Sequence, residues 1–350
     1  MNPTDQADRS VAGSVATTST LDVVQTRAYR ALQDHAAIVD RSARMRMSFT
    51  GDKAKEALGG LLTNDVASLT KGAGQRAAAL TPKGRVIALV RVIDRGDDLL
   101  VDADAAAGAG FVAMIRKFVN PRLARHTELT AATGCVGVYG PEAARLLAPL
   151  LGEGAASLAE LPPMGSITIG SAEDAVLVVR STDLGVTGYD CIATADRIAR
   201  LDGVLAAAGI ARADATVAAV ARVEAGMPQW GVEMDDETIP QEANLDALGA
   251  ISFNKGCYTG QEVVARIHFR GHVNRHLRWL TAAEPLAAGS TVQDATGKEI
   301  GTVRSSVVSP QRGPLAIAMV RREVAPGDEV TVLADGREIR VRCAEISYEQ

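Results

Sequence analysis

The chain has 350 residues, of which 47% are hydrophobic and 23% are charged. This length and composition are typical of a globular protein with about two or three domains and a sizeable core. The net charge of -5 argues against a surface that binds nucleic acid generally, although it is compatible with a local basic patch.

The cysteine pattern indicates a reducing compartment. Four cysteines lie far apart without a Cys-x-x-Cys pair, which disfavours a disulfide framework and a thiolate zinc site. No apolar run is long enough to span a bilayer. Residues 1–22 are rich in Ser, Thr and Ala and lack the apolar segment of a signal peptide, so we expect a disordered tail. These features predict a cytoplasmic protein without a membrane partner.

Alternation and helical spacing predict the elements of the first part of the chain. Residues 85–94 are β-branched and partly alternating, as in a half-buried strand, and a turn leads to a second strand over 99–103. Phe111, Ile115 and Phe118 recur at helical spacing, which predicts a helix after that strand.

The middle of the chain alternates between strand and helix signals. Residues 135–139 are typical of a strand, and Gly140-Pro141-Glu142 begins a helix, because proline suits the first helical position and a carboxylate meets the positive end of the dipole. Residues 175–179 predict another buried strand. Helices are expected over 197–208 and over 215–225, each ended by glycine.

Residues 279–350 consist of short alternating runs separated by turn pairs. Asp335-Gly336 lies between the runs 330–333 and 339–342, which is a strong signal for a two-residue hairpin. We therefore expect a small all-β module, a barrel, attached to an α/β body over 23–278.

The most informative motif is Lys255-Gly256-Cys257-Tyr258-Thr259-Gly260-Gln261-Glu262. A lone cysteine is most often a small buried hydrophobe. Here the flanking glycines let the backbone turn sharply and keep the thiol accessible. The positive charges of Lys255 and Arg266 would favour a nucleophilic or metal-binding thiolate at Cys257. We therefore predict a functional cysteine, although the sequence does not identify its spatial neighbours.

Glu224 lies in the last turn of a predicted helix, which is the unfavourable end for a carboxylate. Such a carboxylate suits a heterocycle that presents an amidine-like pair of donors, since two parallel hydrogen bonds would fix the ring in plane. A solvated or salt-bridged glutamate is the alternative. Aspartates elsewhere, such as Asp183 and Asp190, would suit acid and base roles, but nothing in the sequence brings two of them together.

The segment from Lys255 to Arg278 is rich in cationic and imidazole side chains. These are Lys255, Arg266, Arg270, Arg275 and Arg278, with His268, His272 and His276. The histidine spacing would form a metal face on a helix, but Gly271 and the alternation over 263–269 predict a strand and a loop, which disfavours a metal site. A patch for an anionic ligand tail or phosphate, and a merely solvated face, are both open.

The motif at 255–262 resembles the signature of the YgfZ family of folate-binding proteins, which is related to the T-protein (aminomethyltransferase) of the glycine cleavage system. The resemblance covers about residues 25–345. Further matching segments are Thr63-Asn64-Asp65, Gly140-Pro141-Glu142-Ala143, Gly188-Tyr189-Asp190, Arg222-Val223-Glu224-Ala225-Gly226 and Pro240-Gln241-Glu242.

The resemblance implies an α+β fold with three domains arranged like a cloverleaf around a central hole that holds tetrahydrofolate. Two interleaved α/β subdomains would be followed by a C-terminal β-barrel. Glu224 would hold the pterin ring, and Lys255 and Cys257 would be the catalytic pair. The further residues expected to bind the cofactor are Arg266, Tyr258 and Gln261.

The same resemblance implies a role in the maturation or repair of iron–sulfur enzymes, including radical enzymes that modify tRNA. Iron–sulfur client enzymes or assembly factors are then the expected partners. One departure matters: the T-protein has a Gly-Gly-x-x-Asp-Asp segment, and the corresponding stretch here, residues 83–88, has no carboxylate. Proton handling during aminomethyl transfer would lack its acid, which argues against glycine cleavage activity but leaves folate binding intact.

We therefore predict a tetrahydrofolate-binding protein that assists iron–sulfur cluster assembly or repair. One alternative is a folate-dependent aminomethyltransferase or demethylase. Another is a module that docks on RNA, or on an RNA-modifying enzyme, through the patch from Arg266 to Arg278. The overall acidity and the scarcity of aromatic residues argue against direct nucleic-acid binding.

Overall fold

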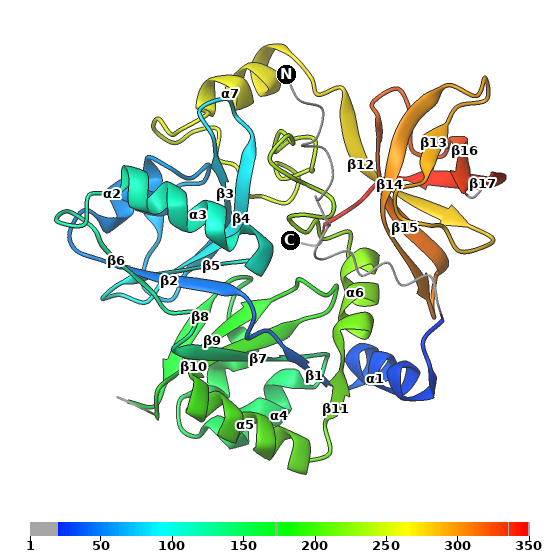
Figure 1. Cartoon of the computed structure of the whole chain (residues 1–350). Helices are drawn as coiled ribbons and strands as arrows, with labels where there is room; N and C mark the ends of the chain where they lie inside the picture. The colour runs from blue at the N-terminus through cyan, green and yellow to red at the C-terminus, as the bar shows by residue number, and fades with distance from the viewer. Residues whose placement is uncertain (1–19, 172–173, 335, 349–350) are drawn as a thin grey trace, which may run out of the picture.

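The structure is a computed structural model that describes residues 20–171, 174–334 and 336–348. Two α/β subdomains are stacked one above the other, and a β-barrel stands beside them (Figure 1). This is the predicted fold class. Apart from residues 20–22, the disordered tail predicted over 1–22 lies outside the described residues.

The first subdomain is built on a six-stranded sheet with the strand order β11-β1-β7-β10-β9-β8. Neighbouring strands are antiparallel except for β1 and β11. Its strands are β1 Ala37–Asp40, β7 Thr133–Tyr139, β8 Ser166–Ile169, β9 Val176–Ser181, β10 Gly188–Thr194 and β11 Ala211–Ala213. One face packs against α4 Ala143–Leu151, η2 Ala155–Glu160 and α5 Ala195–Ala207.

The second subdomain is an antiparallel five-stranded sheet with the order β3-β4-β5-β2-β6. Its strands are β2 Met45–Thr50, β3 Gly74–Leu80, β4 Val86–Asp94, β5 Leu99–Ala103 and β6 Arg125–Glu128, and its helices are α2 Ala54–Gly59, η1 Val66–Ser68 and α3 Ala105–Phe118. The chain leaves the six-stranded sheet after β1, builds this sheet, and returns with β7. The subdomains are therefore interleaved.

The barrel closes with the strand order β12-β15-β14-β13-β16-β17. Its strands are β12 Arg275–Ala282, β13 Thr291–Gln293, β14 Glu299–Ser309, β15 Gly313–Arg321, β16 Glu329–Ala334 and β17 Arg337–Ala344. The hairpin predicted around Asp335-Gly336 is present, because Ala334 pairs with Arg337. The body–barrel boundary predicted after residue 278 falls within β12.

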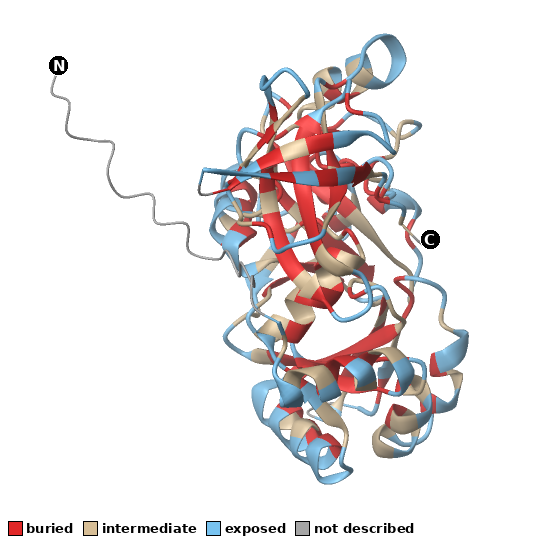
Figure 2. Ribbon diagram, turned by 90° about the vertical axis from the view of Figure 1, so that its right-hand side faces the viewer, coloured by how far each residue is buried: buried red, intermediate tan, exposed pale blue. Residues whose placement is uncertain are grey.

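Two helices and the end of the chain connect the three units. α1 Val23–Asp34 and α6 Ala215–Glu224 share a hydrophobic core with residues of the barrel. After β17 the chain runs back to the place where the units meet (Figure 1), and Ile346 is buried there. Buried residues concentrate along the strands, while the outer faces of the helices are exposed (Figure 2). Among the helices in the described ranges, none has both the length and the apolar character that crossing a membrane requires.

The segment 263–269 was predicted as a strand, and this prediction was wrong, because it lies in helix α7 Gln261–Arg270. Gly260 has a φ of 82°, which lets the chain turn directly into the helix. Glu262 in the first turn is favourable for the helix dipole. Val264 is the one buried residue of this helix, so α7 has no repeated apolar face. The sequence therefore shows little helical periodicity, and the alternation of β-branched residues dominated the prediction.

Candidate functional site

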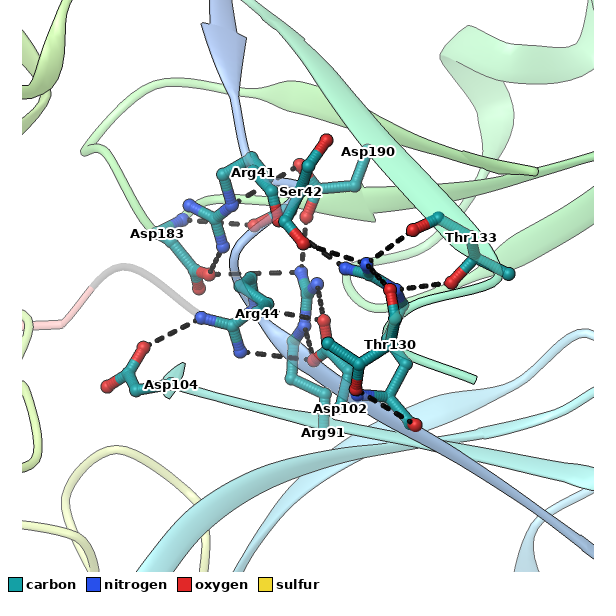
Figure 3. Close-up of polar contacts among 12 residues, drawn as sticks. Arg41, Ser42, Arg44, Arg91, Asp102, Asp104, Thr130, Thr133, Asp183 and Asp190 are labelled. Atoms are coloured by element: carbon teal, nitrogen blue, oxygen red, sulfur yellow. Dashed lines mark hydrogen bonds and ion pairs between the residues drawn. The ribbon is translucent and has the colours of Figure 1, made fainter. Parts of the chain in front are cut away.

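A cluster of buried arginines and aspartates joins the two α/β subdomains (Figure 3). Arg91 on β4 contacts Asp102 on β5 through Nε and Nη2, both at 2.6 Å, and contacts Asp190 on β10 through Nη1 at 2.5 Å. Arg44 adds a contact from Nε to Asp102 at 2.9 Å. Burial alone would raise the pKa of Asp102, but attraction to Arg44 and Arg91 lowers it well below its ordinary value. The buried charges are therefore paired, and they hold the sheets in a fixed relation.

Asp183, in the connection between β9 and β10, extends this cluster. Its carboxylate accepts hydrogen bonds from Nη2 of Arg41 and from Nη2 of Arg76, both at 2.7 Å. Burial opposes ionisation, but Arg76 and Arg41 lower the pKa of Asp183 well below its usual range. Asp183 is therefore a fixed anion. Nε of Arg41 also lies 3.7 Å from Oδ1 of Asp190. The fold therefore places Asp183 and Asp190 around one arginine, which the sequence alone could not predict.

Glu224 is the last residue of α6, as the sequence predicted, and its carboxylate is held from both sides. The hydroxyl of Tyr29 on α1 donates to Oε1 at 2.9 Å and to Oε2 at 3.0 Å. The hydroxyl of Ser309, at the end of β14, donates to Oε1. Burial raises the pKa of Glu224 above its ordinary value, and these two hydrogen bonds oppose the shift. The carboxylate is thus oriented by the barrel and by α1.

Glu224 opens onto a cavity of about 220 Å³, which we call the Glu224 cavity. All three units contribute to its wall: Arg76 comes from β3 of the five-stranded sheet, Thr187 from the connection between β9 and β10 of the six-stranded sheet, and Trp279 from β12 of the barrel, while Tyr348 follows β17. The remaining wall includes Thr182, Gly185 and Val186. This is a concave site at a domain interface, with aromatic surfaces and a few convergent polar groups, which is typical of a small-molecule site.

The orientation of Trp279 is fixed by its surroundings. Its Nε1 donates to the carbonyl of Val223 at 2.8 Å, and the guanidinium of Arg312 stacks 4.2 Å from its ring centre. A flat polar ring in the cavity would therefore find an aromatic wall, a carboxylate acceptor at Glu224 and an arginine at Arg76.

The thiol of Cys257 lies elsewhere, on an exposed loop formed by residues 255–260, which we call the Cys257 loop. Lys255 does not contact this thiol among the described residues. Its amine instead donates to the carbonyls of Gly59 and Leu62, the second at 2.7 Å, and lies 5.0 Å from the ring centre of Tyr258. Burial lowers the pKa of Lys255 to about 8.

The two glycines of the loop have different roles. Gly260 has a φ of 82°, and a Cβ built there would lie 2.7 Å from the carbonyl oxygen of Thr81. Only glycine fits this position, where the loop packs against the turn between β3 and β4. A Cβ at Gly256 would meet nothing within 4 Å. Gly256 therefore leaves the thiol side of the loop open to solvent.

The other predicted site residues do not reach the Glu224 cavity. Tyr258 is buried beneath Lys255, whereas Gln261 and Arg266 lie on α7, where Arg266 is exposed. None of these three residues lines the Glu224 cavity in the described structure, and neither does Cys257.

The histidines of this region also do not converge. His268 stacks on Phe253 with 3.6 Å between ring centres, while His276 lies on β12 of the barrel. Within the described ranges, no three or more His, Cys, Asp and Glu side chains gather in a way that would hold a metal ion.

Two interleaved α/β subdomains followed by a closed barrel define a protein with the T-protein fold. The family model described as the GCVT N-terminal domain matches residues 14–255, so the chain belongs to this family. The model described as the CAF17 C-terminal beta-barrel domain matches residues 275–346, the stretch that forms the barrel.

Individual relatives carry two different names. An aminomethyltransferase of Synechococcus sp. (strain RCC307) is 26% identical over 313 residues, covering 89% of this chain and 86% of that protein. A tRNA-modifying protein YgfZ of Klebsiella pneumoniae (strain 342) is 28% identical over 316 residues, covering 86% and 90%. The crystal structure of the glycine cleavage system aminomethyltransferase T from Bartonella henselae superposes with a TM-score of 0.83 at 22% identity, covering 95% of this chain and 92% of that chain. The resemblance predicted from the motifs is confirmed.

Sequence reasoning identified Glu224 but missed the residues around it. Tyr29 and Ser309 hold its carboxylate, and Trp279 and Tyr348 form aromatic walls. They are spread over most of the chain and share no local motif. The rarity of aromatic residues, 3% of the chain, could have drawn attention to Tyr29, Trp279 and Tyr348, but nothing in the sequence marks Ser309.

Proposed function

We propose that this chain binds tetrahydrofolate in the Glu224 cavity and assists iron–sulfur cluster assembly or repair through the thiol of Cys257. The observation that carries the proposal is the oriented, half-buried carboxylate of Glu224 in a cavity walled by all three units. The name of the Klebsiella relative, a tRNA-modifying protein, fits a protein whose clients include enzymes that modify tRNA.

The chemistry of the cavity supports a pterin as the bound ring. A pterin presents adjacent N–H donors that a carboxylate can accept in parallel. Tyr29 and Ser309 both donate to Oε1 of Glu224, while Oε2 accepts only the longer branch from Tyr29. Oε2 thus keeps acceptor capacity. A volume of about 220 Å³ is below the usual range for a whole drug-sized ligand, so the rest of the folate would extend beyond the cavity.

The surroundings of the cavity support binding more than aminomethyl transfer. Val86 and Ala88, in the stretch where the T-protein has its acidic pair, are buried apolar residues. Glu224 is the only carboxylic acid that lines the cavity in the described structure. Asp183 nearby is a fixed anion. If Glu224 holds the pterin, no second carboxylic acid among the described lining residues is left to transfer a proton.

The position of Cys257 supports a role toward a partner. The other three cysteines, Cys135, Cys191 and Cys343, are buried, so Cys257 is the thiol that another molecule can reach. A surface thiol is suited to transient ligation of iron or sulfur during transfer to a client enzyme. This assigns the folate and the thiol to separate places on one protein.

The iron–sulfur role is tested by complementation of a strain that lacks this protein, with the activity of an iron–sulfur enzyme as the readout. We expect Cys257→Ser and Glu224→Gln each to restore less activity than wild type. Glu338→Gln, which changes an exposed glutamate of the barrel, is the matched control and should restore it fully. Full restoration by Cys257→Ser would show that the proposed thiol role is wrong.

A further inference from the structure

A second and larger cavity, of about 370 Å³, lies between α6, the connection from β1 to β2 and the barrel. Met227 lines both this second cavity and the Glu224 cavity. In the connection between β9 and β10, Asp183 and Leu184 line the second cavity, and the residues on either side of them, Thr182 and Gly185, line the Glu224 cavity. The two cavities therefore flank the same wall. A volume of about 370 Å³ is within the range of sites that enclose small organic ligands.

Most of the charged groups in this wall are already paired. Arg44 donates to Asp104 at 2.8 Å and Arg41 to Asp183 at 2.7 Å. Arg222 donates to the buried Glu233 at 2.9 Å. These arginines have no charge left for a ligand without the loss of an internal ion pair. The apolar part of the wall includes Val39, Leu184, Ala218, Ala219, Met227 and Val232.

Arg304 on β14 is the exception among the arginines that line this cavity. It makes no side-chain hydrogen bond or ion pair with the described residues, and its Nε is buried without a partner. The pairing of β14 with β15 shifts register between Val303 and Ser305, so Arg304 is the extra residue of a β-bulge. Bulges redirect side chains and are frequent beside binding sites.

The bulge is fixed by its neighbour. The hydroxyl of Ser305 donates to Oε1 of Glu233, whose Oε2 accepts from Arg222 and from the backbone of Gln229. Glu233 is thus engaged by three other donors, and within the described residues its ion pair is with Arg222 and not with Arg304. Attraction to Arg304 contributes to the lowered pKa of Asp235, but that carboxylate is bound first by the hydroxyl of Thr238, which donates to it at 2.7 Å.

We propose that this second cavity binds an organic oxyanion with an apolar body, whose anionic group is held by the guanidinium of Arg304. Arg41, Arg44 and Arg222 are already paired with carboxylates and do not compete for the anion. The apolar residues of α6 contact the apolar body of the ligand. Glu224 does not line this second cavity, so the two sites can be filled together. This inference does not depend on the proposed folate site.

The test uses two fluorescent probes with the same apolar body. 8-Anilinonaphthalene-1-sulfonate carries an oxyanion, and N-phenyl-1-naphthylamine does not. We expect the wild type to bind the sulfonate more tightly. Arg304→Gln should weaken the sulfonate at least about tenfold, as the loss of a charge-assisted hydrogen bond implies, and leave the neutral probe unchanged. Arg321→Gln, an exposed arginine on β15, is the matched control and should change neither.

A second variant locates the probe. Ala219→Phe places a large side chain in the cavity and should abolish the binding of both probes, with an unchanged circular dichroism spectrum and thermal midpoint. Glu224→Gln should leave sulfonate binding unchanged, as should saturating tetrahydrofolate. Equal sulfonate affinity of Arg304→Gln and wild type overturns the proposal, as does undiminished binding to Ala219→Phe or displacement by tetrahydrofolate.

Discussion

The Glu224 cavity and the Cys257 loop differ in how the fold builds them. Glu224 is oriented by hydroxyl groups of α1 and the barrel, and the cavity wall comes from all three units. Cys257 is exposed, and its loop is held by the amine of Lys255, which donates to the carbonyls of Gly59 and Leu62, and by the close approach of Gly260 to Thr81. The cavity therefore depends on the relative position of the three units, whereas the loop depends on its packing against the five-stranded subdomain.

This difference teaches that the motif richest in chemistry does not have to lie where a ligand is enclosed. The Cys257 loop carries a thiol but does not enclose a ligand. The Glu224 cavity can enclose a ligand, but no cysteine lines it in the described structure. A protein of this kind can bind one molecule while it presents a thiol to another.

The largest expected effect is on the arginine–aspartate cluster that fixes the subdomains behind the cavity. Arg91→Leu would leave Asp102 and Asp190 buried with fewer cations, so we expect the free energy of unfolding to fall by about 3–5 kcal/mol. Thermal or denaturant unfolding measures this. Arg116→Leu, which removes an exposed ion pair with Glu128, should cost less than about 1 kcal/mol. Similar losses in the two variants would contradict the role given to the cluster.

The Cys257 loop offers a matched pair of glycine substitutions. Gly260→Ala forces a side chain into a left-handed conformation and against Thr81, so it should destabilise the protein by at least about 1–2 kcal/mol. Gly256→Ala meets open space and should change the stability by less than about 0.5 kcal/mol. Differential scanning calorimetry distinguishes them. An equal effect at both positions would show that the loop is not packed as described.

The lowered pKa of Lys255 predicts a pH dependence of stability. The unfolded amine keeps its proton up to about pH 10.5, while the folded amine loses it near pH 8. The unfolded state therefore binds more protons over this interval, and the free energy of unfolding rises with pH. The rise should be on the order of 1 kcal/mol, since solvent screens a half-exposed amine. We expect the difference in the free energy of unfolding between wild type and Lys255→Met, measured by urea titration, to rise in this way between pH 8 and 10.5. A flat difference would contradict a partly buried amine.

The smallest effect on stability is expected at Cys257. Its side chain is exposed, so Cys257→Ser should change the free energy of unfolding by less than about 0.5 kcal/mol. Under native conditions iodoacetamide should modify one thiol in the wild type and none in this variant, because the other three cysteines are buried. Mass spectrometry of the labelled protein reads this directly. Rapid labelling of Cys135 or Cys343 would contradict the burial that separates the two regions.

Several regular elements could be predicted from the sequence because their signals are local. The strand predicted over 85–94 is β4, and the hairpin at Asp335-Gly336 joins β16 to β17. The helix α7 was missed because its β-branched residues alternate over too short a span and because Gly260, which begins the helix, also suits a loop. Short apolar runs do not distinguish helix from strand by periodicity.

The candidate site was predictable only in part. Glu224 was singled out as a candidate because a carboxylate at the end of a helix conflicts with the dipole, but that local observation left a solvated glutamate open, and the pterin assignment came from the family resemblance. Its partners Tyr29 and Ser309 are far away in the chain and were brought to it by the closure of the barrel against α1 and α6. Lys255 was expected beside the thiol, but sequence adjacency does not determine direction, and its amine points to the carbonyls near α2.

The most direct test is calorimetric titration of tetrahydrofolate, under reducing and oxygen-free conditions, into wild type, Glu224→Gln and Cys257→Ser. We expect the wild type to bind and Glu224→Gln to bind at least about tenfold more weakly, because it loses a charge-assisted pair of hydrogen bonds. Cys257→Ser should bind like the wild type, since its side chain lies outside the cavity. Equal binding by wild type and Glu224→Gln, or binding lost only in Cys257→Ser, would contradict the separation of the folate site from the thiol.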